Sequence, residues 1–140
     1  MLKLIRHKLD MAVILLVDEN PLRASLRQSL LERATPDVVR VSSPAEALCM
    51  VESEDFAQAL RLVVTGGRMN GISSAEFVNE LRVRMPQVPV LVLTDHGVKQ
   101  DEKQQERQSM SGVCYVSASS PEELRTTVDR LLHGSSRQTA

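Results

Sequence analysis

The sequence predicts an α/β fold, a doubly wound five-stranded parallel sheet between two layers of helices. Two observations lead to this prediction. Five short apolar runs alternate with polar-faced segments of helical length over 140 residues. The runs are continuous and rich in Val, Leu and Ile, which is typical of parallel strands that helices cover on both faces. Because parallel strands need crossover connections, the alternation favours right-handed strand–helix–strand units within one domain.

The five predicted strands are the runs 13–17, 38–41, 60–64, 89–93 and 113–116. Three of the predicted helices share a start signal, in which a side chain that can cap the helix precedes a proline. These signals are Asn20-Pro21, Ser43-Pro44 and Ser120-Pro121. The spacings from Ser43 to Glu46 and from Ser73 to Glu76 are also typical of a capping box, which marks a helix start.

Apolar side chains at helical spacing predict the buried face of each helix. In the first helix these are Leu22, Leu26 and Leu30. In the later helices they are Ala47, Leu48 and Val51, then Phe77, Val78 and Leu81, and finally Leu124, Val128, Leu131 and Leu132. We expect Pro86 to end the third of these helices and Gly134 to end the last.

The helical segment between the fourth and fifth strands differs from the others, because residues 99–109 include no apolar side chain. Only Val98 and Met110 flank it with side chains to bury. Since a helix gains most of its stability from packing an apolar face, we expect this one to be marginal. It is either a solvated, frayed helix or a mobile face that binds a partner.

The composition argues against several functional classes. A formal net charge of −1 gives no sign of a surface for nucleic acid or membrane, which would need clustered Lys and Arg. Three aromatic residues, Phe56, Phe77 and Tyr115, provide no platform for stacking bases. No stretch is long enough to span a bilayer, and the first ten residues lack the apolar core of a secretory signal.

We therefore expect a cytoplasmic protein whose two cysteines, Cys49 and Cys114, are buried and reduced. The predicted organisation is an N-terminal extension over residues 1–11, one domain over 12–133 and a flexible tail over 134–140.

Polar and small residues follow the predicted strands where ligands usually bind, beyond the carboxyl ends of an open α/β sheet. Asp18 and Glu19 follow the first strand, and 65–67 (Thr-Gly-Gly) follow the third. Thr94 and Asp95 follow the fourth strand, and 117–118 (Ser-Ala) follow the fifth.

Four motifs around these ends make residues 13–132 resemble the receiver domain of two-component response regulators. The motifs are ILLVDEN at 14–20, VVTGGRMNG at 63–71, VLVLT at 90–94 and GVCYVSA at 112–118. The resemblance implies the flavodoxin-like, CheY-like fold with strand order 2-1-3-4-5. It also implies a stand-alone signal-transduction module of a phosphorelay.

The same resemblance assigns roles to the surviving pocket residues. Asp18 and Glu19 match the acidic pair that helps to hold Mg²⁺, and Thr94 matches the hydroxyl that binds the phosphoryl group. Tyr115 matches the aromatic side chain that changes rotamer when a receiver switches.

Two essential groups of the family are missing. Gly66 is at the position of the aspartate that accepts the phosphoryl group in the family. Ala118 is at the position of the lysine that neutralises the phosphoryl oxygens. The resemblance therefore implies a degenerate pseudo-receiver that is not phosphorylated and is not an enzyme. With Asp18 and Glu19 left and no lysine, the pocket is expected to be negative. Mg²⁺ would bind weakly at best, and no cofactor is required.

Three functional hypotheses follow. In the first, the domain acts by contact with a histidine kinase, a phosphotransfer protein, another regulator or a second copy of itself. By the resemblance, the contact faces are residues 98–132 and the first helix, with Arg23 and Arg27. In the second, Asp95 serves as a displaced phosphate acceptor. In the third, the emptied pocket beside Gly66 binds a small molecule.

Overall fold

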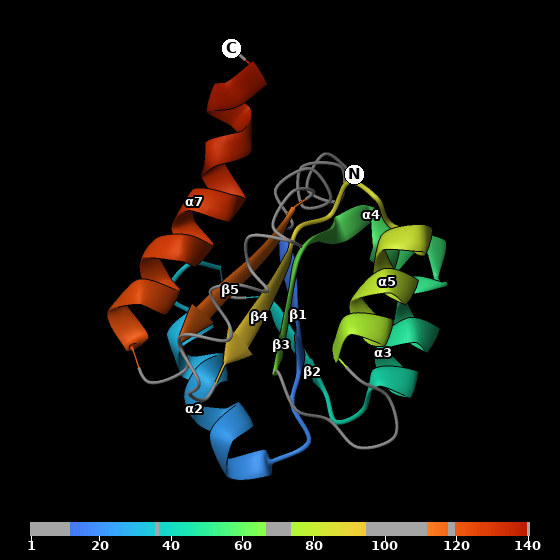
Figure 1. The fold of residues 1–140 in the computed structure, drawn as a ribbon, viewed down its shortest axis with the longest axis horizontal. Coiled ribbons are helices and arrows are strands. Elements are labelled where there is room, and N and C mark those ends of the chain that lie inside the picture. The colour runs from blue at the N-terminus through green and yellow to red at the C-terminus, as the bar shows by residue number, and fades with distance from the viewer. Residues whose placement is uncertain (1–11, 36, 67–73, 95–111, 118–119, 140) are drawn as a thin grey trace, which may run out of the picture.

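The computed structural model describes residues 12–35, 37–66, 74–94, 112–117 and 120–139, and for 74 and 133–139 it describes the backbone alone. Five parallel strands form a sheet in the order β2-β1-β3-β4-β5 (Figure 1). They are β1 (Val13–Val17), β2 (Val38–Val41), β3 (Leu60–Gly66), β4 (Val90–Thr94) and β5 (Val113–Ser117). The predicted fold class and strand order are confirmed.

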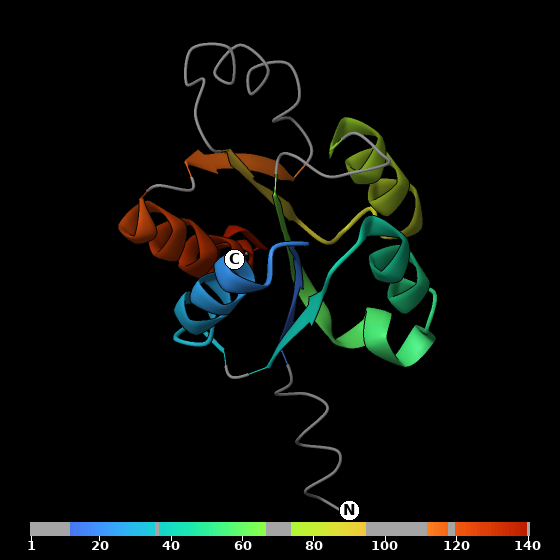
Figure 2. The ribbon, with the colours of Figure 1, turned by 90° about the horizontal axis from the view of Figure 1, so that it is seen from below.

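Helices cover both faces of this sheet (Figure 2). Helices α2 (Pro21–Leu31) and α7 (Pro121–Thr139) lie on one face. Helices α3 (Pro44–Val51), α4 (Glu54–Ala59) and α5 (Ser74–Arg84) lie on the other. The molecule therefore has three layers, with the sheet in the middle.

Two apolar cores result, because successive side chains of a strand point to opposite faces. On β1, Val13, Leu15 and Val17 belong to the core under α3 and α5. Ile14 and Leu16 belong to the core under α2 and α7. All five are buried, as expected for a strand in the centre of a parallel sheet.

The three proline-marked helix starts are confirmed by their caps. The Asn20 Oδ1 accepts a hydrogen bond from the Arg23 amide at 2.9 Å, and the Ser43 Oγ accepts one from the Glu46 amide at 3.2 Å. The Ser120 Oγ accepts one from the Glu123 amide at 3.3 Å. Each cap satisfies one of the free amides of the first helical turn.

The predicted buried face of the first helix is wrong. Leu22 and Leu26 are 75% and 65% exposed, whereas Ala24, Arg27 and Leu31 are buried on α2. Leu30, the third residue of that predicted face, is partly buried. The predicted faces of the other helices agree better. Ala47, Val51, Phe77, Val78, Leu81, Leu124 and Val128 are buried, and Leu48, Leu131 and Leu132 are partly buried.

Other local features also differ from the sequence prediction. Helix α4 was not predicted, because its six residues are too few to show a helical period and lead directly into β3. Helix α7 continues past Gly134 to Thr139, since one glycine costs a helix only about 1 kcal/mol. Cys49 is exposed and Cys114 is half-buried, so the prediction that both cysteines are buried is wrong. Both are free thiols.

The predicted segment 99–109 and the serine of the second capping box, Ser73, lie outside the described residues. Within the part that is described, no helix is long and apolar enough to cross a membrane.

Candidate functional site

The carboxyl ends of the strands meet at one edge of the sheet, as the sequence predicts. The strand register pairs Val17 with Thr65, Gly66 with Leu93, and Thr94 with Ser117. Asp18 follows β1 directly, so the structure brings Asp18, Gly66 and Thr94 to the same edge. Ala118 and Asp95 lie outside the described residues.

The Asp18 carboxylate is buried and bound to two arginines of α2. Its Oδ2 accepts a hydrogen bond from Arg27 Nη1 at 2.7 Å, and its Oδ1 accepts one from Arg23 Nη2 at 3.0 Å. The Asn20 amide donates to the same Oδ1 at 3.0 Å. The Asp18 side chain is 0% exposed and that of Arg27 is 9% exposed, so this ion pair is shielded from water. Both carboxylate oxygens are therefore occupied by protein donors.

A third arginine reaches the same residue from the neighbouring strand. The Arg40 Nη2 on β2 donates a hydrogen bond to the Asp18 carbonyl oxygen at 3.2 Å. We call Asp18, Arg23, Arg27 and Arg40 the Asp18 cluster. Among the described residues, the Asp18 carboxylate thus has two guanidinium groups as ion-pair partners, and a third guanidinium binds its backbone carbonyl.

The Asp18 cluster explains the orientation of α2. Ala24, Arg27 and Leu31 are spaced by three and four residues, so they share one helix face, and that face is buried against the sheet. Turning Arg27 inward to reach Asp18 leaves Leu22 and Leu26 on the exposed side. In the sequence, Ala24, Arg27 and Leu31 have a helical spacing as regular as that of the leucines, but the leucines have the stronger apolar signal.

Gly66 is the buried last residue of β3, and its backbone pairs with Leu93 of β4. It provides no carboxylate, hydroxyl or thiol to this edge. The adjacent Thr65 is fully buried, and its Oγ1 donates a hydrogen bond to the Gly66 carbonyl at 3.2 Å. Since neighbouring side chains of a strand point to opposite faces, Thr65 does not replace a side chain at position 66.

Thr94 ends β4 with a half-buried side chain. Its Oγ1 donates a hydrogen bond to the Val116 carbonyl on β5 at 3.3 Å, which uses the single proton of the hydroxyl. Tyr115 lies two strand positions before Ser117 and is half-buried against the core under α3 and α5. The hydroxyl oxygen of Thr94 keeps the capacity to accept hydrogen bonds.

The chain as a whole matches a known protein family. Residues 14–129 match the family model of the response regulator receiver domain. The chain belongs to the response regulator receiver family. It is thus a receiver domain of two-component signalling, as the motifs at the strand ends predict. A comparison with curated protein sequences finds no match.

Several solved receiver structures have the same fold. A receiver domain protein from Clostridium thermocellum is 20% identical, with a TM-score of 0.73 over 91% of this chain and 98% of the other. A response regulator receiver protein from Sinorhizobium medicae is 24% identical, with a TM-score of 0.73 over 89% and 96%. The chemotaxis protein CheY4 of Vibrio cholerae is 25% identical, with a TM-score of 0.70 over 87% and 99%.

In this receiver, sequence reasoning missed the pairing of Asp18 with Arg23 and Arg27 and the contact of Arg40 with Asp18. Arg23 and Arg27 were expected on an outer surface, where a partner would bind. The structure instead directs both of them to Asp18, with Arg27 buried and the Arg23 side chain 41% exposed. In the described part of the chain, no three His, Cys, Asp or Glu side chains gather as a metal site would require.

Proposed function

We propose that this receiver domain signals by protein contact and without a phosphorylation cycle. The observation that carries the proposal is the pairing of Asp18 with Arg23 and Arg27 beside a strand end that holds glycine at position 66. The partner is a histidine kinase, a phosphotransfer protein or another regulator of the same signalling system, or a second copy of the domain.

The chemistry at this edge of the sheet supports the proposal that the domain has no phosphorylation cycle. Phosphoryl transfer to a receiver needs a carboxylate nucleophile, and Gly66 has no side chain. Mg²⁺ would have to displace guanidinium groups from both oxygens of Asp18 before it could bind there. We therefore infer that Mg²⁺ binding by Asp18 and Glu19 is weak at most, and that no cofactor is needed.

The exposed surface of α2 supports the proposal that the domain signals by protein contact. Leu22 and Leu26 lie one turn apart and are largely exposed, and the partly exposed Arg23 lies between them in sequence. Neighbouring exposed leucines on a helix, next to a charged side chain, are suited to burial against a partner. The other face expected from the family, residues 98–132, lies partly outside the described residues.

The conformation of such a domain is set by packing and by its partner. The Arg27–Asp18 pair connects α2 to the end of β1. A partner then shifts the domain between conformations only as far as it binds one of them better than the other.

The test is an amide NMR titration with Mg²⁺ and beryllium fluoride, which mimics a phosphoryl group. We expect no saturable shift at Asp18, Gly66, Thr94 or Tyr115 in a well-dispersed spectrum. A saturable response at these residues would contradict the proposal. The hypothesis that Asp95 is a displaced phosphate acceptor is tested separately by incubating the protein with labelled acetyl phosphate. The hypothesis requires that the protein becomes labelled and that Asp95→Ala abolishes the labelling.

A further inference from the structure

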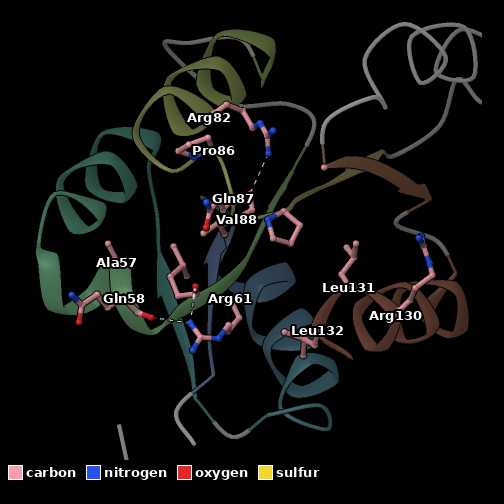
Figure 3. A pocket seen from close by; sticks show the side chains of 13 residues that line it. Ala57, Gln58, Arg61, Arg82, Pro86, Gln87, Val88, Arg130, Leu131 and Leu132 are labelled. Carbon is pink, nitrogen blue, oxygen red and sulfur yellow. Dashed lines mark hydrogen bonds between the residues drawn. The ribbon is translucent and has the colours of Figure 1, made fainter. Parts of the chain in front are cut away.

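A cavity of about 750 Å³ lies at the amino edge of the sheet, lined by residues at the starts of β3, β4 and β5 (Figure 3). This edge is opposite to the one that carries Asp18. Its walls come from the α4–β3 junction, the end of α5 with the segment that leads to β4, and the second half of α7. We call it the amino-edge cavity. Its size is in the range of cavities that bind small molecules.

Three arginines line the amino-edge cavity, one from each wall: Arg61, Arg82 and Arg130. Its described lining includes no aspartate or glutamate. Among the residues that the structure describes, none of the three arginines forms an ion pair. Within the described lining, the cavity therefore has three positive charges and no carboxylate to balance them.

Backbone carbonyls hold two of these guanidinium groups in place without neutralising them. The Arg61 Nη1 donates a hydrogen bond to the Gln58 carbonyl at 2.8 Å, and the Arg82 Nη1 donates one to the Val88 carbonyl at 3.4 Å (Figure 3). A guanidinium has five N–H donors, so each side chain keeps donors for another acceptor. Fixing the groups beforehand lowers the entropy lost when a ligand binds.

Gly112 leaves room for the Arg82 side chain in the wall of the cavity. It has a φ of +83°, which L side chains rarely adopt. A Cβ at this position would lie 3.0 Å from Arg82 Nη1. Glycine thus satisfies two requirements here, the backbone turn into β5 and the room for the guanidinium.

We propose that the amino-edge cavity binds a small organic polyanion, a molecule with two or more phosphate or carboxylate groups on an apolar body. The planar guanidinium fork matches phosphate and carboxylate oxygens and binds both in pairs of hydrogen bonds. Between the arginines, Leu60, Val88 and Pro89 provide apolar lining for the body of the ligand. The three-walled, concave shape favours a small molecule over an extended chain.

The experiment is an amide NMR titration of the full chain with ATP, pyrophosphate and citrate, at constant ionic strength and without divalent cations. We expect saturable shifts at Arg61, Val88 and Gly112, and none at Asn20 beside the Asp18 cluster. Tighter binding of ATP and pyrophosphate than of citrate would assign phosphate groups, and the reverse order would assign carboxylates. The absence of a saturable shift at the cavity with all three probes would overturn the proposal.

Matched variants distinguish a specific binding site from non-specific attraction of anions to a positively charged surface. Arg61→Gln and Arg82→Gln should each weaken binding about tenfold, because each removes charge-assisted hydrogen bonds. The control is Arg125→Gln, which removes an exposed arginine of α7 outside the cavity and should leave the affinity within about twofold. An equal loss in all three variants would also overturn the proposal.

Discussion

The Arg27 Nη1 lies 2.7 Å from the Asp18 Oδ2, and both side chains are almost completely buried. In a receiver, the acidic residue after the first strand is expected to face a metal ion. Here the side chain of this residue instead pairs with an arginine of the next helix. We therefore expect Asp18 to stabilise the contact between α2 and β1 and to be less available to a metal ion.

Arg27→Met is expected to destabilise the domain by about 3–5 kcal/mol, because it leaves a buried carboxylate without its closest partner. The free energy of unfolding is measured by urea denaturation followed by far-UV circular dichroism. Arg33→Met is the matched control, since Arg33 is exposed just after α2 and should change stability by about 0.5 kcal/mol or less.

The double variant Asp18→Asn/Arg27→Met checks the cause. If the charge pair is responsible, removing both charges costs less than the sum of the two single variants, with a coupling of at least about 1 kcal/mol. Additive losses would show that Arg27 acts through packing alone.

Placing Asp at position 66 and Lys at position 118, as the proposed loss of the acceptor and the lysine suggests, should not by itself create tight Mg²⁺ binding. In Gly66→Asp/Ala118→Lys, both Asp18 oxygens remain bound to Arg23 and Arg27, so we expect weak binding by isothermal calorimetry. Adding Arg23→Ala removes the more exposed guanidinium and should tighten Mg²⁺ binding about tenfold. Tight Mg²⁺ binding by the double variant would show that the arginines do not compete with the metal.

Leu22→Gln and Leu26→Gln should weaken the contact with a partner and leave the fold intact. Burying a leucine side chain contributes about 1.5–3 kcal/mol, so each change should lower the affinity about tenfold or more. Glutamine is a good helix former, which keeps the change at the surface. Binding is measured by calorimetry with the histidine kinase and phosphotransfer proteins of the same signalling system, and self-association by sedimentation.

Val83→Gln is the matched control for this surface. Val83 is 78% exposed on α5, which covers the opposite face of the sheet. Its replacement should leave partner binding unchanged. Equal effects of all three substitutions would argue against α2 as the contact surface.

Glu46 gives a prediction about pH. Its Oε1 accepts a hydrogen bond from the Ser42 amide at 2.9 Å, and this bond, with that of the Ser42 hydroxyl, lowers the pKa of Glu46 from its usual value of 4.5. A lowered pKa in the folded state adds stability above pH 4.5, and this stability is lost as the pH falls through the lower folded-state pKa.

The free energy of unfolding of the wild type should therefore exceed that of Glu46→Gln at pH 6, and the difference should shrink as the pH falls below 4.5. The matched control is Glu54→Gln, because Glu54 is an exposed acid in the first turn of α4. A difference that does not change with pH would mean that the carboxylate charge contributes nothing at position 46.

The strands and helix caps were predictable because their signals are local. A continuous apolar run such as β1 can be buried only inside a covered sheet, and Asn20-Pro21 fixes a helix start within two residues. The edge at which Asp18, Gly66 and Thr94 meet follows from the parallel order of the strands.

The buried face of α2 was not predictable from such local signals. Leu22 and Leu26 have the stronger apolar signal, but the burial of Arg27 depends on a charge that lies nine positions earlier in the chain. Likewise, Arg61, Arg82 and Arg130 come from three separate elements, and no local pattern indicates that they line one cavity.

Strand β3 begins with Leu60 at the amino-edge cavity and ends with Gly66 at the edge of the Asp18 cluster. At about 3.3 Å per residue, the two sites lie roughly 20 Å apart, too far for one small ligand to contact both. β3 forms ladders with both β1 and β4, so its backbone is hydrogen-bonded on both sides between the two sites. A ligand at one edge and a partner at the other could therefore be bound at the same time, on opposite ends of one strand.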